Sequence, residues 1–401
     1  MKKDKIITAA DNFIMHTYKR IPIVITRGQG IYLWDNKGKK YIDFLGARGA
    51  ANTGYSTPEI VNAVISQAKK LILVTNDFYT APQAEFARLL VKHSFADKVF
   101  FCNSGAEANE GAIKLSRLYS YKRYGNGRYV IVSATNSFHG RTYGALSATG
   151  QRKYQIGFGP LVPGFRYVRF NDMEDMNAAL GDDVCAVILE PVQGEGGIYP
   201  ANNEYIKFVR EQTQKKDILL IMDEVQVGLG RTGKLFSYEH FNIKPDVVTI
   251  AKSIAGGIPM GAILATRDVA EVFDYGTHGT TFGGSPLAAQ AGISALTYII
   301  KHRLPQNARR LGNITLKYLS KLKNEHKDLI KDVRGMGLAI GVEFNDPDIV
   351  TKVFEKCLEM GLITNITNNN IIRFLPPLII TEQELKKGLD IFKEAIEKII
   401  T

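Results

Sequence analysis

The feature that most constrains the fold of this chain is a series of short apolar runs, rich in β-branched residues, that alternate with longer amphipathic segments. The strand-like runs occupy residues 99–102, 129–133, 184–190, 219–223, 247–251 and 262–265. Helical periodicity lies between several of them, for example at 106–121 and 204–214. Strands that are apolar on both faces and joined by helices are typical of a mainly parallel sheet between helical layers. The sequence therefore predicts an α/β fold.

The end of the chain shows a different pattern. Helical segments at 306–325, 346–359 and 382–399 mix there with short strands near 337–344 and 371–374. A chain of 401 residues is long enough for two domains of unequal size, each with its own core. We expect residues 51–300 to form the large domain. Residues 1–50 and 301–401 are expected to form one smaller α+β domain from both termini.

Composition and charge bear on the class of partner. Lysine and arginine outnumber aspartate and glutamate by 51 to 40, but no basic run alternates with aromatics, so small anions are expected rather than nucleic acid. No run approaches the ~18 apolar residues of a membrane span, and the N-terminus has no apolar signal-peptide core. Cys102, Cys185 and Cys357 have no disulfide or metal-ligand spacing. We expect a cytoplasmic protein without a membrane segment or a metal.

Polar residues accumulate where the predicted strands end. Ser104, Gly105 and Ala106 follow the strand at 99–102 and open a helix. Ligands of open α/β sheets bind beyond the carboxyl ends of strands, and a helix N-terminus with small residues favours an anion such as phosphate. An ordinary helix cap would give the same local sequence, so this signal alone leaves both interpretations open.

Asp223 ends one predicted strand, and Lys252 directly follows its neighbour. A desolvated lysine has a lowered pKa and can form a Schiff base with an aldehyde. A buried carboxylate beside a pyridine nitrogen keeps that nitrogen protonated, so that the ring accepts electrons. A structural Asp–Lys ion pair is the alternative explanation of the same two residues.

A glycine-rich segment at 228–233 matches the dinucleotide-binding pattern GxGxxG. However, Asp223, Glu224 and Gln226 separate these glycines from the strand. No acidic residue ends a second strand about 20 residues further on, where a ribose contact is expected. We therefore expect a turn at this position.

With these residues in view, the chain resembles the class III (ω-amino acid) aminotransferases of fold-type I nearly end to end. The matching blocks are FFCNSGAEANE (100–110), SFHGRTYGALSATGQ (137–151), EPVQGEGGIYPA (190–201), IMDEVQVGLGRTGKLFSYEH (221–240), AKSIAGGIPMGA (251–262) and HGTTFGGSPLA (278–288). Six blocks in the family's order are far more specific than one. The resemblance implies a seven-stranded, mainly parallel sheet, pyridoxal 5′-phosphate (PLP) as cofactor, and transfer of an amino group to 2-oxoglutarate, giving glutamate.

The resemblance also implies a role for each matching cofactor residue. Lys252 matches the residue that holds PLP covalently and shuttles a proton, and Asp223 matches the partner of the pyridine nitrogen. The remaining cofactor positions are Gln226 at the phenolic oxygen, Phe138 on the ring face, and Ser104, Gly105 and Ala106 at the phosphate. His139, Glu190 and Glu224 are expected to lie behind these residues at most.

Substrate and partner positions are carried over in the same way. Arg141 matches the arginine that grips the substrate α-carboxylate, and Glu195 with Arg373 matches a pair that opens for a carboxylate of 2-oxoglutarate or glutamate. Thr281 matches the residue that reaches the phosphate from the other subunit, which implies a homodimer with shared active sites. Thr280, next to it, is grouped with the substrate-binding positions.

One segment departs from the family pattern. Position 48, which is apolar or tyrosyl in most members, is an arginine here, and two histidines that usually follow are absent. Within the family the chain is most similar to members that act on acetylornithine, so an N-acylated ornithine-like donor is expected. Arg48 raises the hypothesis of an acidic distal group, as in a succinylated donor. An arginine turned to solvent or to the partner subunit is the alternative.

Other activities remain open from the sequence. Succinylornithine or succinyldiaminopimelate, ornithine and 4-aminobutyrate are alternative donors within the family. A PLP- or nucleotide-binding regulator without turnover is a more distant alternative. Such a regulator would be expected to lack the strand-end lysine or one of the two carboxylate-binding arginines, and Lys252, Arg141 and Arg373 are all present.

Overall fold

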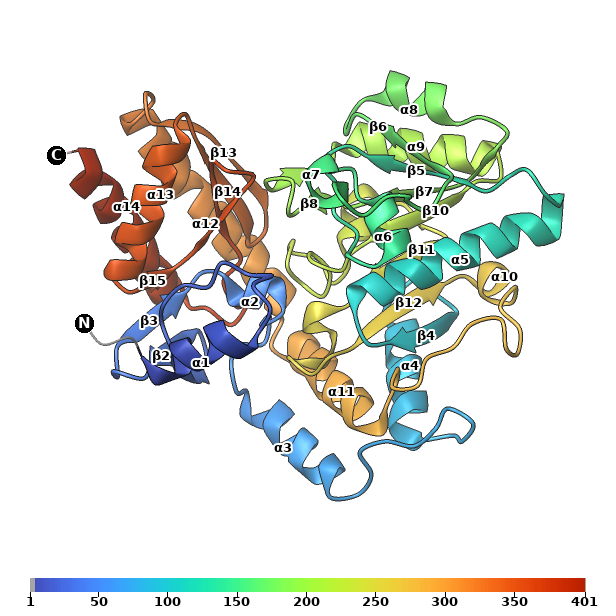
Figure 1. Cartoon of the computed structure of the whole chain (residues 1–401), viewed down its shortest axis with the longest axis horizontal. Helices are drawn as coiled ribbons and strands as arrows, with labels where there is room; N and C mark the ends of the chain where they lie inside the picture. Colours follow the sequence, from blue (N-terminus) through green and yellow to red (C-terminus); the bar gives the residue numbers. More distant parts are fainter. Residues whose placement is uncertain (1–3, 401) are drawn as a thin grey trace.

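Seven strands form the central sheet in a computed structural model that describes residues 4–400 (Figure 1). Their order across the sheet is β4 (Lys98–Cys102), β12 (Gly261–Ala265), β11 (Val247–Ile250), β10 (Leu219–Asp223), β7 (Val184–Leu189), β5 (Val130–Ala134) and β6 (Phe165–Val168). Only β12 runs antiparallel to its neighbours; all other strands of this sheet point the same way. The predicted α/β fold with a mainly parallel seven-stranded sheet is confirmed.

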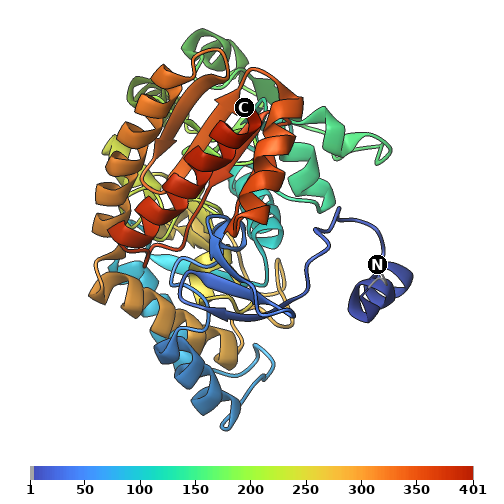
Figure 2. The ribbon, with the colours of Figure 1, turned by 90° about the vertical axis from the view of Figure 1, so that its left-hand side faces the viewer.

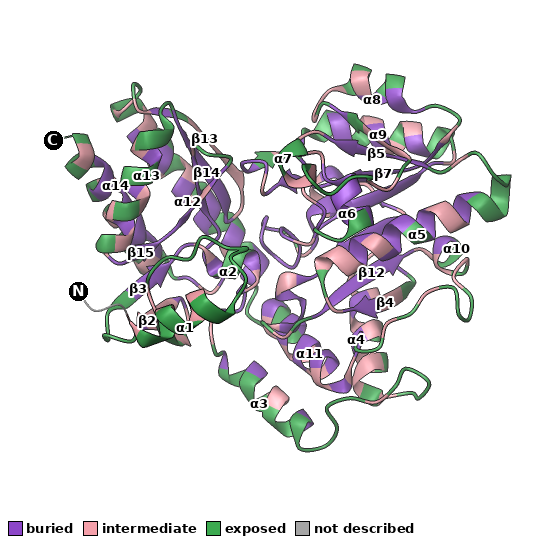
Figure 3. Cartoon of the chain, viewed as in Figure 1, coloured by how far each residue is buried: buried purple, intermediate pink, exposed green. Residues whose placement is uncertain are grey.

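The sheet is buried on both faces because alternate residues of its strands enter two different cores. In β10, Leu219 and Ile221 pack in the core that contains Ala108, Ala112 and Ile113 of helix α5 (Gly105–Tyr124). Leu220 and Met222 point the other way, into the core that contains residues of α9 (Asn203–Lys215). The central strands are therefore apolar at most positions, which is why their sequence showed nearly continuous apolar runs. Figure 3 shows this buried centre.

The last hundred residues build a second, antiparallel sheet. Its strands lie in the order β13 (Ile330–Met336), β14 (Ala339–Phe344), β17 (Ile371–Phe374) and β16 (Asn365–Thr367). Three helices pack with it: α12 (Leu304–Glu325), α13 (Pro347–Glu359) and α14 (Glu382–Ile400). Amphipathic periodicity in the sequence had indicated all three helices.

The N-terminal segment adds a small sheet to this second body. Strands β1 (Ile25–Gln29), β2 (Tyr32–Asp35) and β3 (Lys40–Asp43) pair in sequence order, and β15 (Leu362–Ile363) joins beside β3. Segments from both ends of the chain thus share one sheet. The domain limits at residues 50 and 300 stay a prediction.

The remaining elements connect these bodies or cover them. They are α1 (Lys5–Phe13), the turn α2 (Gly46–Gly49), α3 (Pro58–Ala68), α4 (Ala81–Lys92), α6 (Tyr143–Ala148), α7 (Arg152–Gln155), α8 (Met173–Ala179), β8 (Val192–Gln193), β9 (Tyr199–Pro200), the 3₁₀ segments η1 (Ser237–Phe241) and η2 (Lys252–Ala255), α10 (Arg267–Ala270) and α11 (Pro286–Lys301). Helix α1 stands apart from the rest of the chain (Figure 2) and contains no buried residue. Among residues 4–400, no helix is both long and apolar enough to cross a membrane.

The glycine-rich segment at 228–233 forms a turn, as the sequence predicted. Its central residue, Arg231, is fully buried, and burial lowers its pKa to about 9. The Arg231 guanidinium donates hydrogen bonds to Asn52 Oδ1 (2.6 Å), to the Leu338 carbonyl (3.1 Å) and to the Pro376 carbonyl. The turn therefore joins the N-terminal segment to the C-terminal one.

Candidate active site

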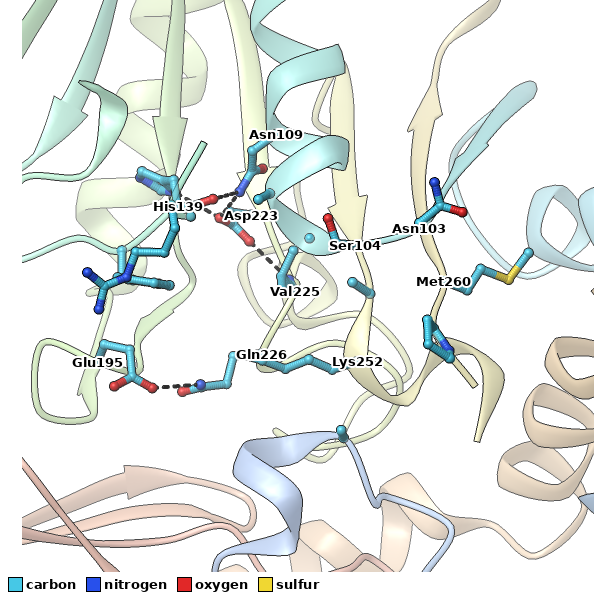
Figure 4. Close-up of a pocket in the computed structure, with 18 of the residues that line it drawn as sticks. Asn103, Ser104, Asn109, His139, Glu195, Asp223, Val225, Gln226, Lys252 and Met260 are labelled. Atoms are coloured by element: carbon cyan, nitrogen blue, oxygen red, sulfur yellow. Dashed lines mark hydrogen bonds and ion pairs between the residues drawn. The ribbon is translucent and has the colours of Figure 1, made fainter. Parts of the chain in front are cut away.

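Five strands that point the same way bring the predicted site residues to one edge of the sheet. The segments that follow β4, β5, β7, β10 and β11 line a cavity of about 430 Å³ at their carboxyl ends (Figure 4). Nine residues predicted from sequence line this cavity: Ser104, Gly105, Ala106, Phe138, Arg141, Glu195, Asp223, Gln226 and Lys252. Such convergence is what the topology of open α/β sheets predicts.

The N-terminus of α5 forms one wall of the cavity. Ser104 caps this 20-residue helix, and its Oγ accepts a hydrogen bond from the Glu107 N–H at 3.2 Å. A Cβ atom added to Gly105 would lie 2.5 Å from Val225 Cγ1, so a larger residue would push the two loops apart. Close backbone packing at the start of a long helix leaves N–H groups and the positive helix end available to an anion.

Lys252 occupies the point where β11 ends. Its φ of +51° is in the left-handed region, which non-glycine residues adopt at an energetic cost and which is common at functional sites. This bend turns the lysine side chain from the strand into the cavity. Burial lowers the pKa of Lys252 to about 8, so that about a tenth of the amine is uncharged at pH 7.

Asp223 is held from several directions. Its Oδ2 atom lies 2.7 Å from Asn109 Nδ2 and 2.7 Å from His139 Nδ1, and Oδ1 accepts a hydrogen bond from the Val225 N–H at 3.0 Å. Thr249 Oγ1 donates in turn to Asn109 Oδ1 at 2.7 Å. Figure 4 shows Asn109 and His139 joined to the Asp223 carboxylate. The sequence placed His139 only behind the site and missed Asn109, although Asn109 lies within the block 100–110.

Glu190 and Glu224 are both buried carboxyl groups, but only Glu190 lines the cavity. Glu190 accepts hydrogen bonds from the Phe138 N–H (3.1 Å) and the Gly194 N–H (3.4 Å), which ties together two loops of the site. Burial and the nearby Asp223 charge raise the pKa of Glu190. Glu224 accepts from the backbone N–H groups of Ser237 (2.6 Å) and Tyr238 (2.7 Å), away from the cavity.

Glu195 lines the cavity and forms an ion pair with Arg373, which lies behind it and does not line the cavity. Arg373 Nη1 lies 2.7 Å from Glu195 Oε1, and the Gln226 amide bonds both residues at 3.2 Å. Burial raises the pKa of Glu195, but the charge and hydrogen bond of Arg373, together with Lys252 and Gln226, outweigh burial and bring the pKa to about 2. Arg373 is fully buried, and its Nη2 atom has no hydrogen-bond partner within residues 4–400.

Arg48 lies on the solvent side of the same carboxylate. Its Nη1 atom is 3.8 Å from Glu195 Oε2, and 57% of its side-chain surface is exposed. The guanidinium is thus directed at the Glu195–Arg373 pair, rather than simply outward. Its role in binding a donor stays a prediction.

Arg141 is exposed at the cavity and is positioned by an aromatic residue that sequence reasoning missed. The Arg141 guanidinium carbon lies 4.1 Å from the centre of the Tyr154 ring, a cation–π geometry. Tyr154 also packs edge-on against Phe138, with ring centres 5.5 Å apart. The neighbouring Gln155 anchors this short helix by donating to the carbonyls of Leu146 (3.2 Å) and Thr149 (2.9 Å). The only sequence signal for Tyr154 is an aromatic residue next to a basic one.

Thr280 and Thr281 do not line the cavity that contains Lys252. They lie in a neighbouring hollow of about 360 Å³, together with Asn103, Glu107 and Phe282. Thr280 Oγ1 accepts a hydrogen bond from Asn103 Nδ2 at 3.1 Å, whereas the Thr281 side chain is exposed. Within one chain, the structure therefore does not bring Thr281 to the other predicted cofactor residues.

The cavity suits PLP in the chemistry of its side chains. A partly uncharged lysine amine can combine with an aldehyde, and Asp223 presents a fixed carboxylate for a protonated pyridine nitrogen. The α5 N-terminus offers a phosphate site, and the volume is in the usual range for cofactor pockets. Within residues 4–400 there is no cluster of three or more His, Cys, Asp or Glu side chains that could hold a metal ion.

Comparison with known proteins decides the family. The family model for class-III aminotransferases matches residues 13–396. The chain belongs to the class-III aminotransferases. This aminotransferase is 47% identical over 393 residues to the acetylornithine aminotransferase of Caldanaerobacter subterraneus, a match that covers 98% of this chain and 99% of that protein.

Solved structures show the same architecture. An ornithine aminotransferase of Toxoplasma gondii, with partial occupancy of PLP at its active site, superposes with a TM-score of 0.95 at 32% identity, over 99% of this chain and 95% of that one. An acetylornithine aminotransferase of Elizabethkingia anophelis gives a TM-score of 0.89 at 35% identity, over 98% of both chains. The protein is thus a PLP-dependent transaminase, with an amino donor and a keto acid such as 2-oxoglutarate as substrates.

Proposed function

We propose that this transaminase moves the terminal amino group of an N-acylated ornithine to 2-oxoglutarate, giving a semialdehyde and glutamate, with acetylornithine as the preferred donor. The observation that carries the proposal is the different state of two arginines, of which one lines the cavity and the other is paired with a glutamate of the cavity wall. Arg141 is exposed and free to grip a carboxylate, whereas Arg373 is covered by Glu195. The relative at 47% identity, named an acetylornithine aminotransferase, supports the choice of donor.

This pair of arginines explains how one cavity serves two substrates. Both the donor and 2-oxoglutarate carry an α-carboxylate, which a guanidinium binds with two parallel hydrogen bonds in a bidentate pair. Only 2-oxoglutarate and glutamate bring a second carboxylate close to the reacting carbon. Glu195 covers Arg373 while the donor is bound and moves aside for that second carboxylate. The unpartnered Nη2 of Arg373 provides an additional hydrogen-bond donor for it.

The residues around Lys252 supply the acid–base chemistry. When bound, PLP contributes an aldehyde that takes up the amino group and a ring that withdraws electrons. Lys252, whose pKa burial lowers to about 8, would act as the general base for the proton on the carbon that bears the amino group and as the general acid that returns it. Asp223 would hold positive charge on the ring nitrogen, and the wall formed by Ser104, Gly105 and Ala106 would bind the phosphate. Phe138 and Gln226, which line the cavity, would hold the cofactor ring, Gln226 through its amide group.

We further propose a homodimer whose subunits complete each other's sites. Thr281 is exposed and separate from its own chain's cavity, as expected of a residue that acts in the partner. Large apolar side chains are exposed near it and on the N-terminal arm: Phe282 is 60% exposed, Phe78 63%, Phe13 87% and Met15 85%. A second copy of the chain is a natural cover for these surfaces.

Mixed dimers test the shared site. Lys252→Ala and Thr281→Ala subunits, inactive or impaired alone, should regain activity when mixed, because one site of the mixed dimer then has both native residues. If Thr281 acts within its own chain, no site of the mixed dimer is native and no activity returns. Sedimentation should give twice the 44.5 kDa chain mass.

A cytoplasmic location is also part of the proposal. Cys102, Cys185 and Cys357 are buried free thiols, a state typical of reducing compartments. Fractionation of cells that produce the protein from its own gene would test this location directly.

The half-reaction with a panel of donors tests the substrate. The holoprotein should be yellow, and acetylornithine should remove the absorption of its aldehyde form, which 2-oxoglutarate should restore. Succinylornithine, succinyldiaminopimelate, ornithine and 4-aminobutyrate form the comparison set. Ornithine deserves inclusion because a T. gondii ornithine aminotransferase shares the fold at a TM-score of 0.95. Preference for ornithine over acetylornithine would refute the donor assignment, and turnover by Lys252→Ala would refute the mechanism.

Arg48 calls for a separate comparison within that panel. If Arg48 binds an acidic distal group of the donor, Arg48→Ala should lower the efficiency with succinylornithine but not with acetylornithine. An unchanged ratio of the two efficiencies would show that Arg48 does not select the donor in this way.

A further inference from the structure

Glu195 lies between two arginines of very different environment. Its Oε1 atom is 2.7 Å from Nη1 of Arg373, which is fully buried. Its Oε2 atom is 3.8 Å from Nη1 of Arg48, which is 57% exposed. The carboxylate therefore has one cation on its inner side and another on its outer side, and the outer distance leaves room for a closer approach.

The turn that carries Arg48 has an unusual backbone. Gly46, Ala47, Arg48 and Gly49 have φ values of +54°, +49°, +58° and +89°, so the four residues form a left-handed turn. Non-glycine residues resist this conformation, and a strained backbone at a site is held only by its surroundings. Asp43 provides part of that support, because its carboxylate accepts hydrogen bonds from the N–H groups of Leu45 (2.7 Å) and Gly46 (3.0 Å).

The same turn packs directly against the chain that follows Arg373. A Cβ atom added to Gly46 would lie 2.1 Å from the Leu375 carbonyl oxygen, and the Leu375 N–H donates to the Phe44 carbonyl at 2.6 Å. A Cβ atom on Gly49 would lie 3.1 Å from the Gln226 carbonyl oxygen. The backbone positions of Arg48, Arg373 and Gln226 are thus fixed relative to one another. The direction of Arg48 toward Glu195 follows from this packing.

We propose that Arg48 receives Glu195 when a dicarboxylate displaces it from Arg373, so that Glu195 alternates between the two arginines. The proposal rests on the opening of the Glu195–Arg373 pair set out above. A carboxylate that leaves a buried cation loses a strong interaction, and a second cation on its path offsets part of that loss. Arg48 is the cation on the outer side, where the displaced carboxylate is also rehydrated.

This role predicts an effect on one class of substrate only. A donor with a single carboxylate near the reacting carbon leaves Glu195 on Arg373, so Arg48 does not change its binding. A dicarboxylate requires the displaced state, which Arg48 stabilises. Because Arg48 is partly exposed, the expected effect is that of an exposed ion pair, about threefold to fivefold in affinity.

The experiment measures glutarate binding to the holoenzyme by calorimetry at about 0.15 M salt. Glutarate has two carboxylates and neither an amino nor a keto group, so it binds without turnover, and valerate is the matched monocarboxylate. Arg48→Leu should weaken glutarate binding about threefold to fivefold and leave valerate binding unchanged. Arg48→Asn is the second neutral variant, because asparagine tolerates a left-handed backbone. Arg48→Lys should stay near the native affinity.

A double-mutant cycle with Glu195→Gln then identifies the route of the effect. Glu195→Gln alone should strengthen glutarate binding, because the side chain that pairs with Arg373 loses its negative charge. On that background Arg48→Leu should have no further effect, since there is no carboxylate to receive. If Arg48→Leu weakens glutarate binding equally on both backgrounds, Arg48 contacts the ligand itself. If it does not weaken glutarate binding on the native background, Arg48 does not receive the Glu195 carboxylate. Either result overturns the proposal. If Glu195→Gln fails to tighten glutarate, the opening of the ion pair itself is wrong, which is a separate failure of the proposed function.

Discussion

His139 and Asp223 meet through a 2.7 Å contact between Nδ1 and Oδ2 in the wall of the cavity that Lys252 also lines. Both side chains are almost fully buried, and Asn109 contacts the same carboxylate oxygen. Asp223 is thereby fixed in position before any ligand arrives. A fixed carboxylate loses little conformational freedom when it pairs with a ring nitrogen.

His139→Gln should therefore weaken PLP binding. A hydrogen bond to a charged group contributes about 1.5 to 3 kcal/mol, so we expect about 10- to 100-fold weaker PLP binding. Quenching of protein fluorescence on adding PLP to the apoprotein measures the affinity. His302→Gln, at an exposed position, is the control and should bind PLP as the native protein does. Equal PLP affinity in His139→Gln would contradict the positioning role.

The two carboxylate-binding arginines should respond differently to substitution. Arg141→Lys keeps the charge but loses the bidentate hydrogen bonding to the α-carboxylate. The value of kcat/KM should therefore fall about 10- to 100-fold for both acetylornithine and 2-oxoglutarate. Arg373→Lys should lower kcat/KM mainly for 2-oxoglutarate, because the donor does not use Arg373. Steady-state kinetics with each substrate varied in turn makes the measurement. The assignment fails if Arg373→Lys impairs both substrates equally.

Tyr154 should support substrate binding through the face of its ring, which contacts Arg141. Tyr154→Phe retains an aromatic face below Arg141, whereas Tyr154→Leu removes it. A cation–π contact contributes about 0.5 to 2 kcal/mol, so Tyr154→Leu should raise KM for both substrates about 2- to 30-fold. Tyr154→Phe should remain close to the native enzyme. Similar defects in the two variants would point to the hydroxyl group instead.

The lowered pKa of Lys252 predicts the pH dependence of PLP capture by the apoprotein. Only the uncharged amine attacks an aldehyde, and burial brings the pKa of Lys252 down to about 8. The rate should therefore rise about tenfold per pH unit below pH 8 and level off above it. Stopped-flow absorbance follows the reaction. A rate that keeps rising to pH 10 would show that the lysine has an ordinary pKa.

Arg231 should be essential for stability rather than catalysis. Arg231→Met removes a buried guanidinium and leaves the Asn52 side chain and the Leu338 and Pro376 carbonyls without their donor. The free energy of unfolding should fall by about 3 to 5 kcal/mol, as measured by urea denaturation. Arg310→Met is the matched control, because Arg310 pairs with Glu382 at an exposed position and should change stability by less than about 1 kcal/mol.

Local sequence patterns predicted the central strands of the large sheet, whereas helix α11 (Pro286–Lys301) was missed although half of its residues are buried. Residues 219–223 were predicted as a strand and form β10 with the same bounds, because its first four residues are all apolar, as expected of a strand buried on both faces. Strand β6 (Phe165–Val168) was missed. It lies at the sheet edge, is half-exposed and contains Arg166, so its sequence lacks that continuous apolar signal. The antiparallel direction of β12 also has no sequence signature of its own, because direction depends on how distant segments connect.

The sequence by itself determined the chemical groups of the site, since motifs at strand ends identified Lys252, Asp223 and the α5 N-terminus. The tertiary structure alone decided which residues surround them. Asn109 reaches Asp223 across 114 positions, and Arg48 and Arg373 reach opposite oxygens of Glu195 from the two ends of the chain. The local pattern of apolar residues indicates which face of a helix or strand is buried. Contacts between distant residues depend instead on how separate helices and strands pack. That packing places Glu195 between a buried and an exposed arginine.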